Sequence, residues 1–187
     1  MKALDEYSDA ELFYLMTEEK KTAEKAFAEL YARHSSRVFA FCRRFLGNKE
    51  EAQDIFQDTF IRFHQSASKD REMTNVPAFL LTIARNLCVN YKRRERTDVS
   101  FEEYMYESED DTNERKELLG ILKTAVSNLS EEYREVFILR EYDGLSYAEI
   151  AKVTNEKLPT VKVRIHRAKQ KIREALEPYF DELKKFE

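Results

Sequence analysis

Apolar residues recur every three to four positions along most of the chain, a spacing typical of amphipathic helices with one buried face. The period is nearly unbroken over residues 23–46 and 48–64, and Gly47 separates the two segments. A glycine there predicts a left-handed cap that ends the first helix, and Asn48 predicts the N-cap of the second. A shorter helix is expected after Ser8, which begins a Ser-x-x-Glu capping box.

The same period returns after a polar stretch. Residues 65–75 carry no period and predict a loop, which ends where Pro77 opens a helix that runs to about Arg94. Four further helices are expected in the C-terminal half, starting near Glu114, Ser130, Ser146 and Pro159. Ser130 is the expected cap of the second of these helices, and Ser146 begins a capping box with Glu149 at the start of the third. The pattern therefore predicts an all-α protein.

Residues 96–113 carry acids and aromatics without an apolar stripe, which predicts a flexible acidic linker. The expected architecture is two helical domains, residues 1–95 and 114–187, joined by this linker. The last two predicted helices, with a turn at 154–158 between them, have the proportions of a helix-turn-helix.

Composition narrows the class of protein further. The 187 residues include three Gly, three Pro and no Trp, and the apolar runs are short and broken by charge. No secretory signal or membrane span is indicated, so a cytoplasmic protein without direct membrane insertion is expected. Cys42 and Cys88 are too few for a disulfide framework and predict buried thiols. No sequence feature calls for a cofactor.

Charge is segregated along the chain, although its net value is only −4. Residues 157–173 carry seven Lys or Arg and no carboxylate, which favours a nucleic-acid partner. The candidate DNA-binding side chains on this helix are Thr160, Lys162, Val163, Arg164, His166, Arg167 and Lys169. The alternative is a basic solvated helix in an ordinary bundle.

The helix that ends near Arg94 offers a second cationic surface. Its candidates for DNA contact are Arg85, Asn86, Lys92, Arg93 and Arg94, because guanidinium and ammonium groups bind phosphates and an Asn amide can pair with a base edge. Cations also favour the C-terminal end of any helix, so a solvated helix end is an equal alternative.

An acidic arc on residues 48–64 requires a different partner. It consists of Glu51, Asp54, Gln57, Asp58 and Ile61. An exposed Ile among acids indicates a docking face for a basic, partly apolar helix, and a plain solvated face is the alternative. No His shares the arc and no Gly-rich phosphate loop accompanies it, so neither a metal site nor a catalytic site is expected.

Four runs in this order resemble the bacterial sigma factors of the extracytoplasmic-function (ECF) group. They read EAQDIFQDTF, FLLTIARN, LSYAEIA and TVKVRIHRA, at residues 51–60, 79–86, 145–151 and 160–168. The resemblance extends over about residues 22–177.

The resemblance implies a promoter-specificity subunit that is no enzyme and has no small-molecule substrate. Such proteins join core RNA polymerase; their N-terminal domain, region 2, reads and melts the minus-ten element, and their C-terminal domain, region 4, reads the minus-thirty-five element. An anti-sigma factor commonly holds them inactive, and one is expected here.

The resemblance also implies residue roles. Asp54, Gln57 and Asp58 would bind the clamp helices of the polymerase beta-prime subunit, and region 4 would meet the beta flap. Arg85, Asn86 and residues 92–94 would face promoter DNA. The loop at 65–75 would hold a flipped base, and the acidic linker would pass near the RNA path. Thr160, Lys162, Arg164, His166 and Arg167 match the minus-thirty-five helix, although helical geometry places Arg164 nearer the apolar seam.

Two other functions compete with this interpretation. A dimeric helix-turn-helix regulator would bind a palindromic operator without polymerase, and it would leave the acidic arc unexplained. A nucleotide hydrolase that uses Asp54 and Asp58 would show metal-dependent turnover.

Overall fold

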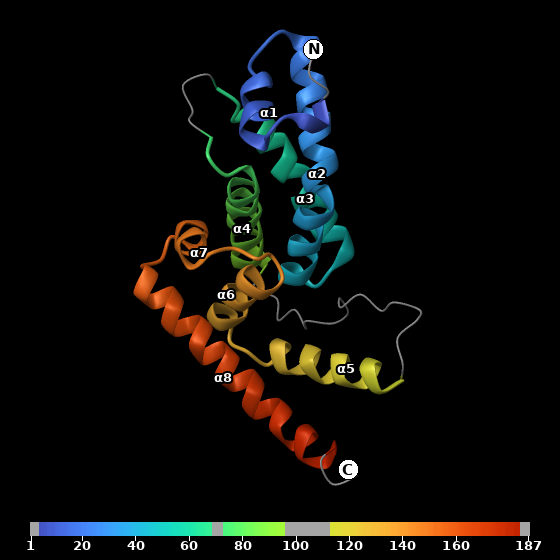
Figure 1. Ribbon diagram of the computed structural model, residues 1–187, viewed down its shortest axis with the longest axis vertical. Coiled ribbons are helices and arrows are strands. Elements are labelled where there is room, and N and C mark those ends of the chain that lie inside the picture. The colour runs from blue at the N-terminus through green and yellow to red at the C-terminus, as the bar shows by residue number, and fades with distance from the viewer. Residues whose placement is uncertain (1–3, 69–72, 96–112, 184–187) are drawn as a thin grey trace. The chain divides into compact units, whose positions relative to one another are not determined.

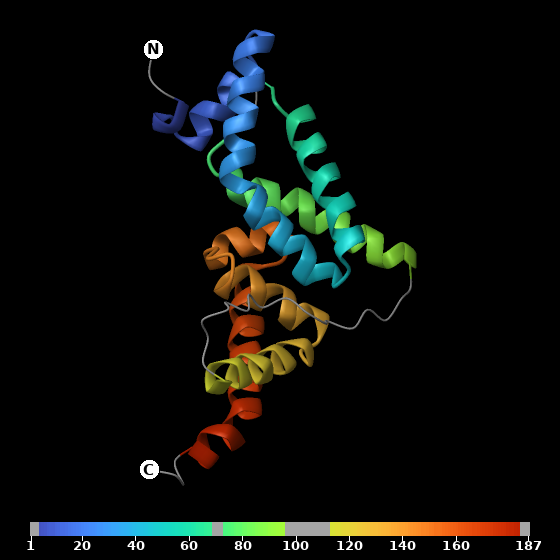
Figure 2. The ribbon, with the colours of Figure 1, turned by 90° about the vertical axis from the view of Figure 1, so that its right-hand side faces the viewer.

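The computed structural model describes residues 4–68, 73–95 and 113–183, and within these ranges every regular element is a helix. The chain divides into two compact units, Met1–Val99 and Ser100–Glu187 (Figures 1 and 2). The all-α prediction is confirmed. The predicted linker at 96–113 lies almost entirely outside the described residues.

The first unit contains one short turn and four helices. They are η1 (Leu4–Glu6), α1 (Asp9–Leu15), α2 (Lys20–Leu46), α3 (Lys49–Gln65) and α4 (Val76–Glu95). Gly47 ends α2 with φ at 80°, and the Asn48 side chain accepts hydrogen bonds from the first-turn amides of α3. The capping box of Ser8 is also present. These caps confirm the predicted boundaries, except that α2 begins at Lys20 rather than near residue 23.

Helix α4 packs against α1, α2 and α3 (Figure 2). Because it has neighbours on several sides, its buried arc is wide, and Leu80, Leu81, Ala84 and Cys88 are all fully buried. Both cysteines of the chain, Cys42 and Cys88, are buried thiols, as predicted.

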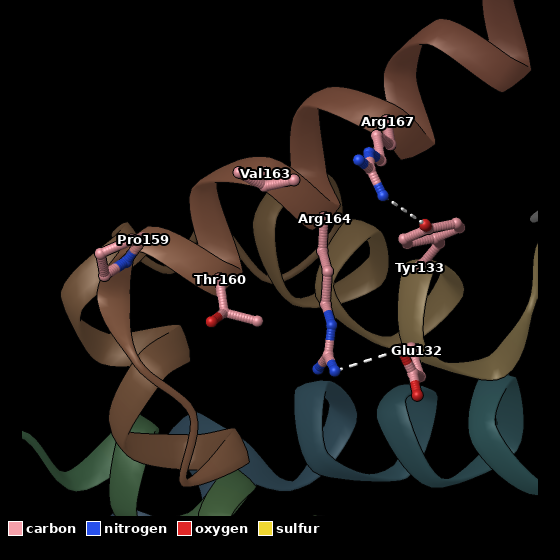
Figure 3. Close-up of a pocket in the computed structure, with 7 residues that line it drawn as sticks. All are labelled: Glu132, Tyr133, Pro159, Thr160, Val163, Arg164 and Arg167. Carbon is pink, nitrogen blue, oxygen red and sulfur yellow. Dashed lines mark hydrogen bonds and ion pairs between the residues drawn. The ribbon is translucent and has the colours of Figure 1, made fainter.

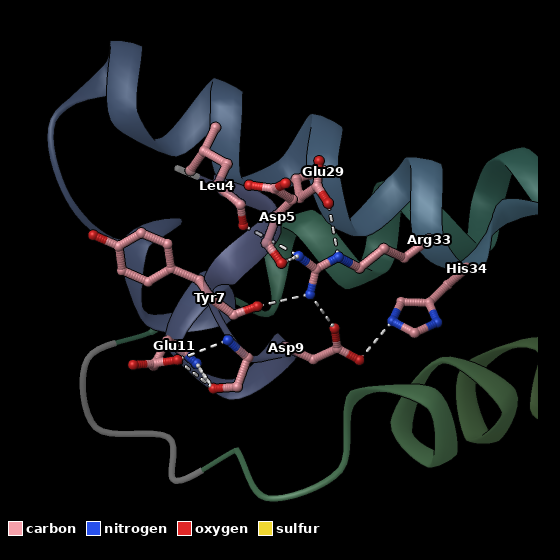
Figure 4. A network of polar contacts seen from close by, with 9 residues as sticks. Leu4, Asp5, Tyr7, Asp9, Glu11, Glu29, Arg33 and His34 are labelled. Carbon is pink, nitrogen blue, oxygen red and sulfur yellow. Dashed lines mark hydrogen bonds and ion pairs between the residues drawn. The ribbon is translucent and has the colours of Figure 1, made fainter. Parts of the chain in front are cut away.

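Arg33 of α2 binds the N-terminal segment, residues 4–9, to the rest of the first unit (Figure 4). Its guanidinium donates to the main-chain oxygens of Tyr7 at 2.8 Å and of Leu4 and Asp5 at 3.1 Å. It also binds Glu29 at 2.8 Å and Asp9 at 3.1 Å. The bond to Glu29 is the main reason that the pKa of Arg33 is raised, although partial burial opposes it.

The second unit contains α5 (Asn113–Ser127), α6 (Glu131–Glu141), α7 (Tyr147–Thr154) and α8 (Leu158–Leu183). Helix α8 packs against all three of the others. One core cluster lies where α5, α6 and α8 meet; its buried residues are Ala125, Val126, Leu129, Phe137, Ala168 and Ile172.

The junction between α5 and α6 differs from the sequence prediction. Ser130 occupies the N-cap position of α6, but its hydroxyl makes no capping hydrogen bond, so the predicted side-chain cap is wrong. Arg134 holds this junction instead, because its Nη2 donates to the main-chain oxygens of Ser127 and Leu129 at 2.7 and 2.8 Å. Burial lowers the pKa of Arg134.

Among the described residues, no helix is both long enough and apolar enough to cross a bilayer.

The Arg33 contacts generate a test of how the N-terminal segment is held. Replacing Arg33 by Ala removes a charged donor from three main-chain oxygens and two carboxylates, so we expect α1 amides to exchange about 30- to 100-fold faster. Hydrogen exchange measured by mass spectrometry on peptides from residues 9–15 reads this directly.

Lys20→Ala provides the control. This lysine of α2 is 90% exposed, and its ion pair with Glu24 is weak because the charged atoms are as far as 4.0 Å apart. The substitution should change exchange in α1 by less than about threefold. Equal exchange in the two variants would show that burial of Leu12 and Phe13 alone holds the segment.

Candidate functional site

The acidic arc of α3 lies on its exposed side. Asp54, Gln57 and Asp58 are exposed, Glu51 is half-buried, and Ile61 is 53% exposed. Within the described ranges, neither Asp54 nor Asp58 makes an ion pair or a hydrogen bond to another side chain. The structure therefore brings all five predicted residues onto one helix face, with an apolar side chain among the carboxylates.

Aromatic packing on the opposite side of α3 fixes the direction in which this face points. The Tyr31 ring of α2 lies 4.8 Å from the ring of Phe60 and 5.9 Å from that of Phe56. Phe27 contacts Phe60 at 6.3 Å and His64 at 5.1 Å. Because tilted and edge-to-face rings interlock, α3 cannot rotate about its axis without losing these contacts.

The second candidate surface is the C-terminal half of α4. Asn86, Arg93 and Arg94 are exposed, whereas Arg85 and Lys92 are half-buried. Arg85 Nη1 lies 3.5 Å from Asn86 Oδ1. The Lys92 ammonium lies 5.0 Å from the centre of the Phe45 ring of α2, which the sequence did not predict.

The third candidate surface belongs to α7, α8 and the turn between them. Ser146 and Glu149 form the predicted capping box at the start of α7, and Asn155 ends the helix in the left-handed conformation at φ 54°. Buried Ile150, Val153, Val161 and Ile165 place these helices in the core of the unit. This is the helix-turn-helix geometry that the spacing predicted.

The outer face of α8 presents a mixed set of side chains. Lys162 and His166 are exposed, Val163 is 49% exposed, and Thr160 is half-buried. Lys169 binds Glu141 of α6 at 2.8 Å, and Arg167 Nη1 donates to the Tyr133 hydroxyl at 3.4 Å. Two of the predicted DNA-binding cations are thus also engaged within the unit.

Arg164 is the least exposed of the predicted cations on α8, with 18% of its side chain accessible. Its guanidinium binds Glu156 at 3.0 Å and Glu132 at 3.1 Å. It lines a cleft of about 410 Å³ together with Glu132, Tyr133, Pro159, Thr160, Val163 and Arg167 (Figure 3). Helical geometry indicated the inward position of Arg164, but only the fold reveals its partner Glu132.

Titratable side chains elsewhere do not gather into a reaction centre in the described parts of the chain. No group of three or more His, Cys, Asp or Glu there is placed to hold a metal ion. His34 lies 2.7 Å from Asp9, as a local hydrogen-bonding residue. His64 packs edge-on against Phe27.

Models of known protein families match a range of residues in each of the two units. The family model for Sigma-70 region 2 matches residues 30–97, and that for Sigma-70, region 4 matches residues 119–172. The first match contains α3 and α4 and the second contains the helix-turn-helix. The two ranges together make up more than half of the chain.

Curated relatives match over most of their length in the same order. The ECF RNA polymerase sigma factor SigW of Bacillus subtilis is 28% identical over 172 residues, 84% of this chain and 92% of the relative. The ECF sigma factor SigE of Mycolicibacterium smegmatis is 32% identical over 170 residues, 87% of this chain and 66% of the relative.

A solved structure shares the fold. The sigma factor RpoE from Bartonella quintana, solved in complex with the anti-sigma factor NepR, matches with a TM-score of 0.68 and 25% identity, covering 82% of this chain and 98% of that one. With both sigma-70 regions present in order and ECF relatives along most of its length, the chain belongs to the ECF group of bacterial sigma-70 factors.

Proposed function

We propose that this sigma factor binds core RNA polymerase through the exposed face of α3 and promoter DNA through α4 and α8. As a member of its family it is an initiation factor and not an enzyme, so its task is to direct the polymerase to promoters.

The observation that carries the docking assignment is the exposed Ile61 among the carboxylates of α3. An apolar side chain that is 53% exposed and surrounded by carboxylates matches the chemistry of a basic, partly apolar partner helix. Asp54 and Asp58 give this face a negative charge that complements basic side chains of the polymerase clamp helices. Their carboxylates remain available because no described residue neutralises them.

The DNA assignments rest on exposed cations and on the helix-turn-helix. Arg93, Arg94 and Asn86 on α4 suit contacts to the minus-ten element, and Lys162, Val163 and His166 on α8 suit the minus-thirty-five element. Two modules on one polymerase raise each other's effective concentration, so neither has to bind DNA tightly alone.

Two assignments concern residues that the structure describes only in part or not at all. The loop at 65–75 is proposed to hold a flipped base, and its residues 69–72 lie outside the described residues. The acidic linker is proposed to pass near the RNA path of the polymerase.

An anti-sigma factor is a further proposed partner, supported by the matching RpoE structure, which contains one. Such an inhibitor would act by covering the α3 face. The beta flap of the polymerase is the proposed partner of the second unit. Because these partners act at the chromosome, the proposed location is the cytoplasm.

Run-off transcription tests the proposal as a whole. The full chain with core polymerase and a random promoter library should yield transcripts that share two upstream elements, and core polymerase alone should not. A transcript-free mixture, together with tight binding of the free chain to a palindromic operator, would favour the dimeric regulator; metal-dependent nucleotide turnover would favour the hydrolase.

Charge reversal on α3 should weaken polymerase capture. We expect Asp54→Lys and Asp58→Lys each to lower the affinity for core polymerase by about tenfold or more, because a like charge then faces the partner's basic helix. Both side chains are exposed, so the melting temperature should change little. Affinity is measured by fluorescence anisotropy of labelled protein titrated with core enzyme.

Glu6→Lys is the matched control, since Glu6 is exposed and lies outside the region 2 match. It should bind like the parent chain. Loss of affinity in all three variants would indicate a general charge effect and contradict the docking role.

Replacing two side chains of α8 should alter promoter choice. We expect the double variant Lys162→Ala, His166→Ala to lose about five- to tenfold of its preference for a matched over a scrambled upstream element, because base and phosphate contacts are lost there. Opening of the downstream element, followed by permanganate footprinting on promoters that retain activity, should change less than about twofold.

Lys171→Ala removes an exposed lysine from another side of α8 and should leave the preference unchanged. A footprint and a preference that match the parent in the double variant would refute the assignment of α8.

A further inference from the structure

The guanidinium of Arg164 is shared between two carboxylates that differ in their environment. Glu156 lies in the helix-turn-helix turn, directly after the left-handed Asn155, and 35% of its side chain is exposed. Glu132 lies in the first turn of α6 and 67% of its side chain is exposed. An ion pair that reaches so far into solvent contributes little to stability and is easily broken.

The exposed carboxylate lies at the cleft that opens beside α8. Figure 3 shows Arg164 directed toward Glu132, with Arg167 above it directed toward Tyr133. Arg167 Nη1 is bound only weakly there, at 3.4 Å from a neutral hydroxyl. The cleft therefore presents two guanidinium groups and the Thr160 side chain, and Glu132 is the carboxylate on its lining.

Charge decides what this cleft can bind. While the ion pairs are intact, Arg164 and Arg167 are balanced by Glu132 and Glu156, so this group has no net charge to attract a phosphate. If Glu132 turns into solvent, the remaining groups carry one positive charge, and one edge of the Arg164 guanidinium is open to a new acceptor next to Arg167. A phosphate oxygen forms strong charge-assisted bonds with such an edge.

We propose that Glu132 is a positioning residue that competes with the DNA backbone for Arg164 and so restrains binding to DNA outside promoters. The inference rests on the proposed function, in which α8 meets the duplex through a face that includes Val163, a residue that also lines this cleft. A duplex held in register by the other contacts of α8 displaces the carboxylate, whereas a passing, weakly held duplex does not.

The test uses holoenzyme, reconstituted from core polymerase and full-length chain, on labelled promoter duplex and on the same duplex with a scrambled upstream element. Glu132→Gln keeps the shape of the side chain and removes its charge. We expect about two- to fivefold tighter binding and a larger gain on the scrambled duplex than on the promoter. On the scrambled duplex the salt dependence should also become steeper by about 0.9 in log–log slope, as one added phosphate contact predicts. The melting temperature should fall by about 3 °C or less.

Glu131→Gln is the matched control, because it removes the same charge from the same helical turn at a residue that does not line the cleft. It should leave the salt slope unchanged. If Glu132→Gln gains no more than Glu131→Gln, the effect is one of net charge and the proposal is overturned.

A double-mutant cycle decides whether the effect passes through Arg164. In an Arg164→Gln background, Glu132→Gln should produce no gain and no change of slope, and a gain that persists there overturns the proposal. Lys162→Ala in the same assay distinguishes a failure of the role of Glu132 from a failure of the proposed function of α8. If it weakens promoter binding while Glu132→Gln is silent, only the role of Glu132 fails; if it also has no effect, the proposed function of α8 fails.

Discussion

The interlocked aromatic rings between α2 and α3 are the constraint on which the first unit depends. Phe60 is buried and Phe56 half-buried where both contact the Tyr31 ring, and with these contacts made Asp54, Asp58 and Ile61 face outward. The ring contacts hold α3 against α2 while contributing nothing to its outer surface. Packing uses only one arc of the helix, so the outer arc can carry charge at little cost to the core.

In the second unit, several of the charged side chains are paired with neighbours. The sequence shows no carboxylate among the cations of α8, but three of these cations contact residues elsewhere in the unit. Arg164 binds Glu132 and Glu156, Lys169 binds Glu141, and Arg167 contacts Tyr133. The positive surface that remains is narrower than the run of Lys and Arg suggests. These contacts hold the long side chains of α8 close to the surface of their own unit.

Local signals in the sequence predicted the helices and the arcs of their faces well. Gly47, Asn48 and Ser146 act through the residues next to them, so their capping roles can be read directly from the chain. The contacts that escaped prediction join distant positions. Glu132 contacts Arg164 across 32 positions, and Arg167 contacts Tyr133 across 34. Periodicity carries no information about such pairs.

The direct passage from α2 into α3 has a consequence for how the chain can vary. Gly47 and Asn48 serve as the end of one helix and the start of the next, so no spare residue absorbs a change of length. One inserted residue would turn α3 by about 100° and place carboxylates against the rings of α2. A residue inserted after Gln65, where α3 has ended, would leave the rotation of the helix unchanged.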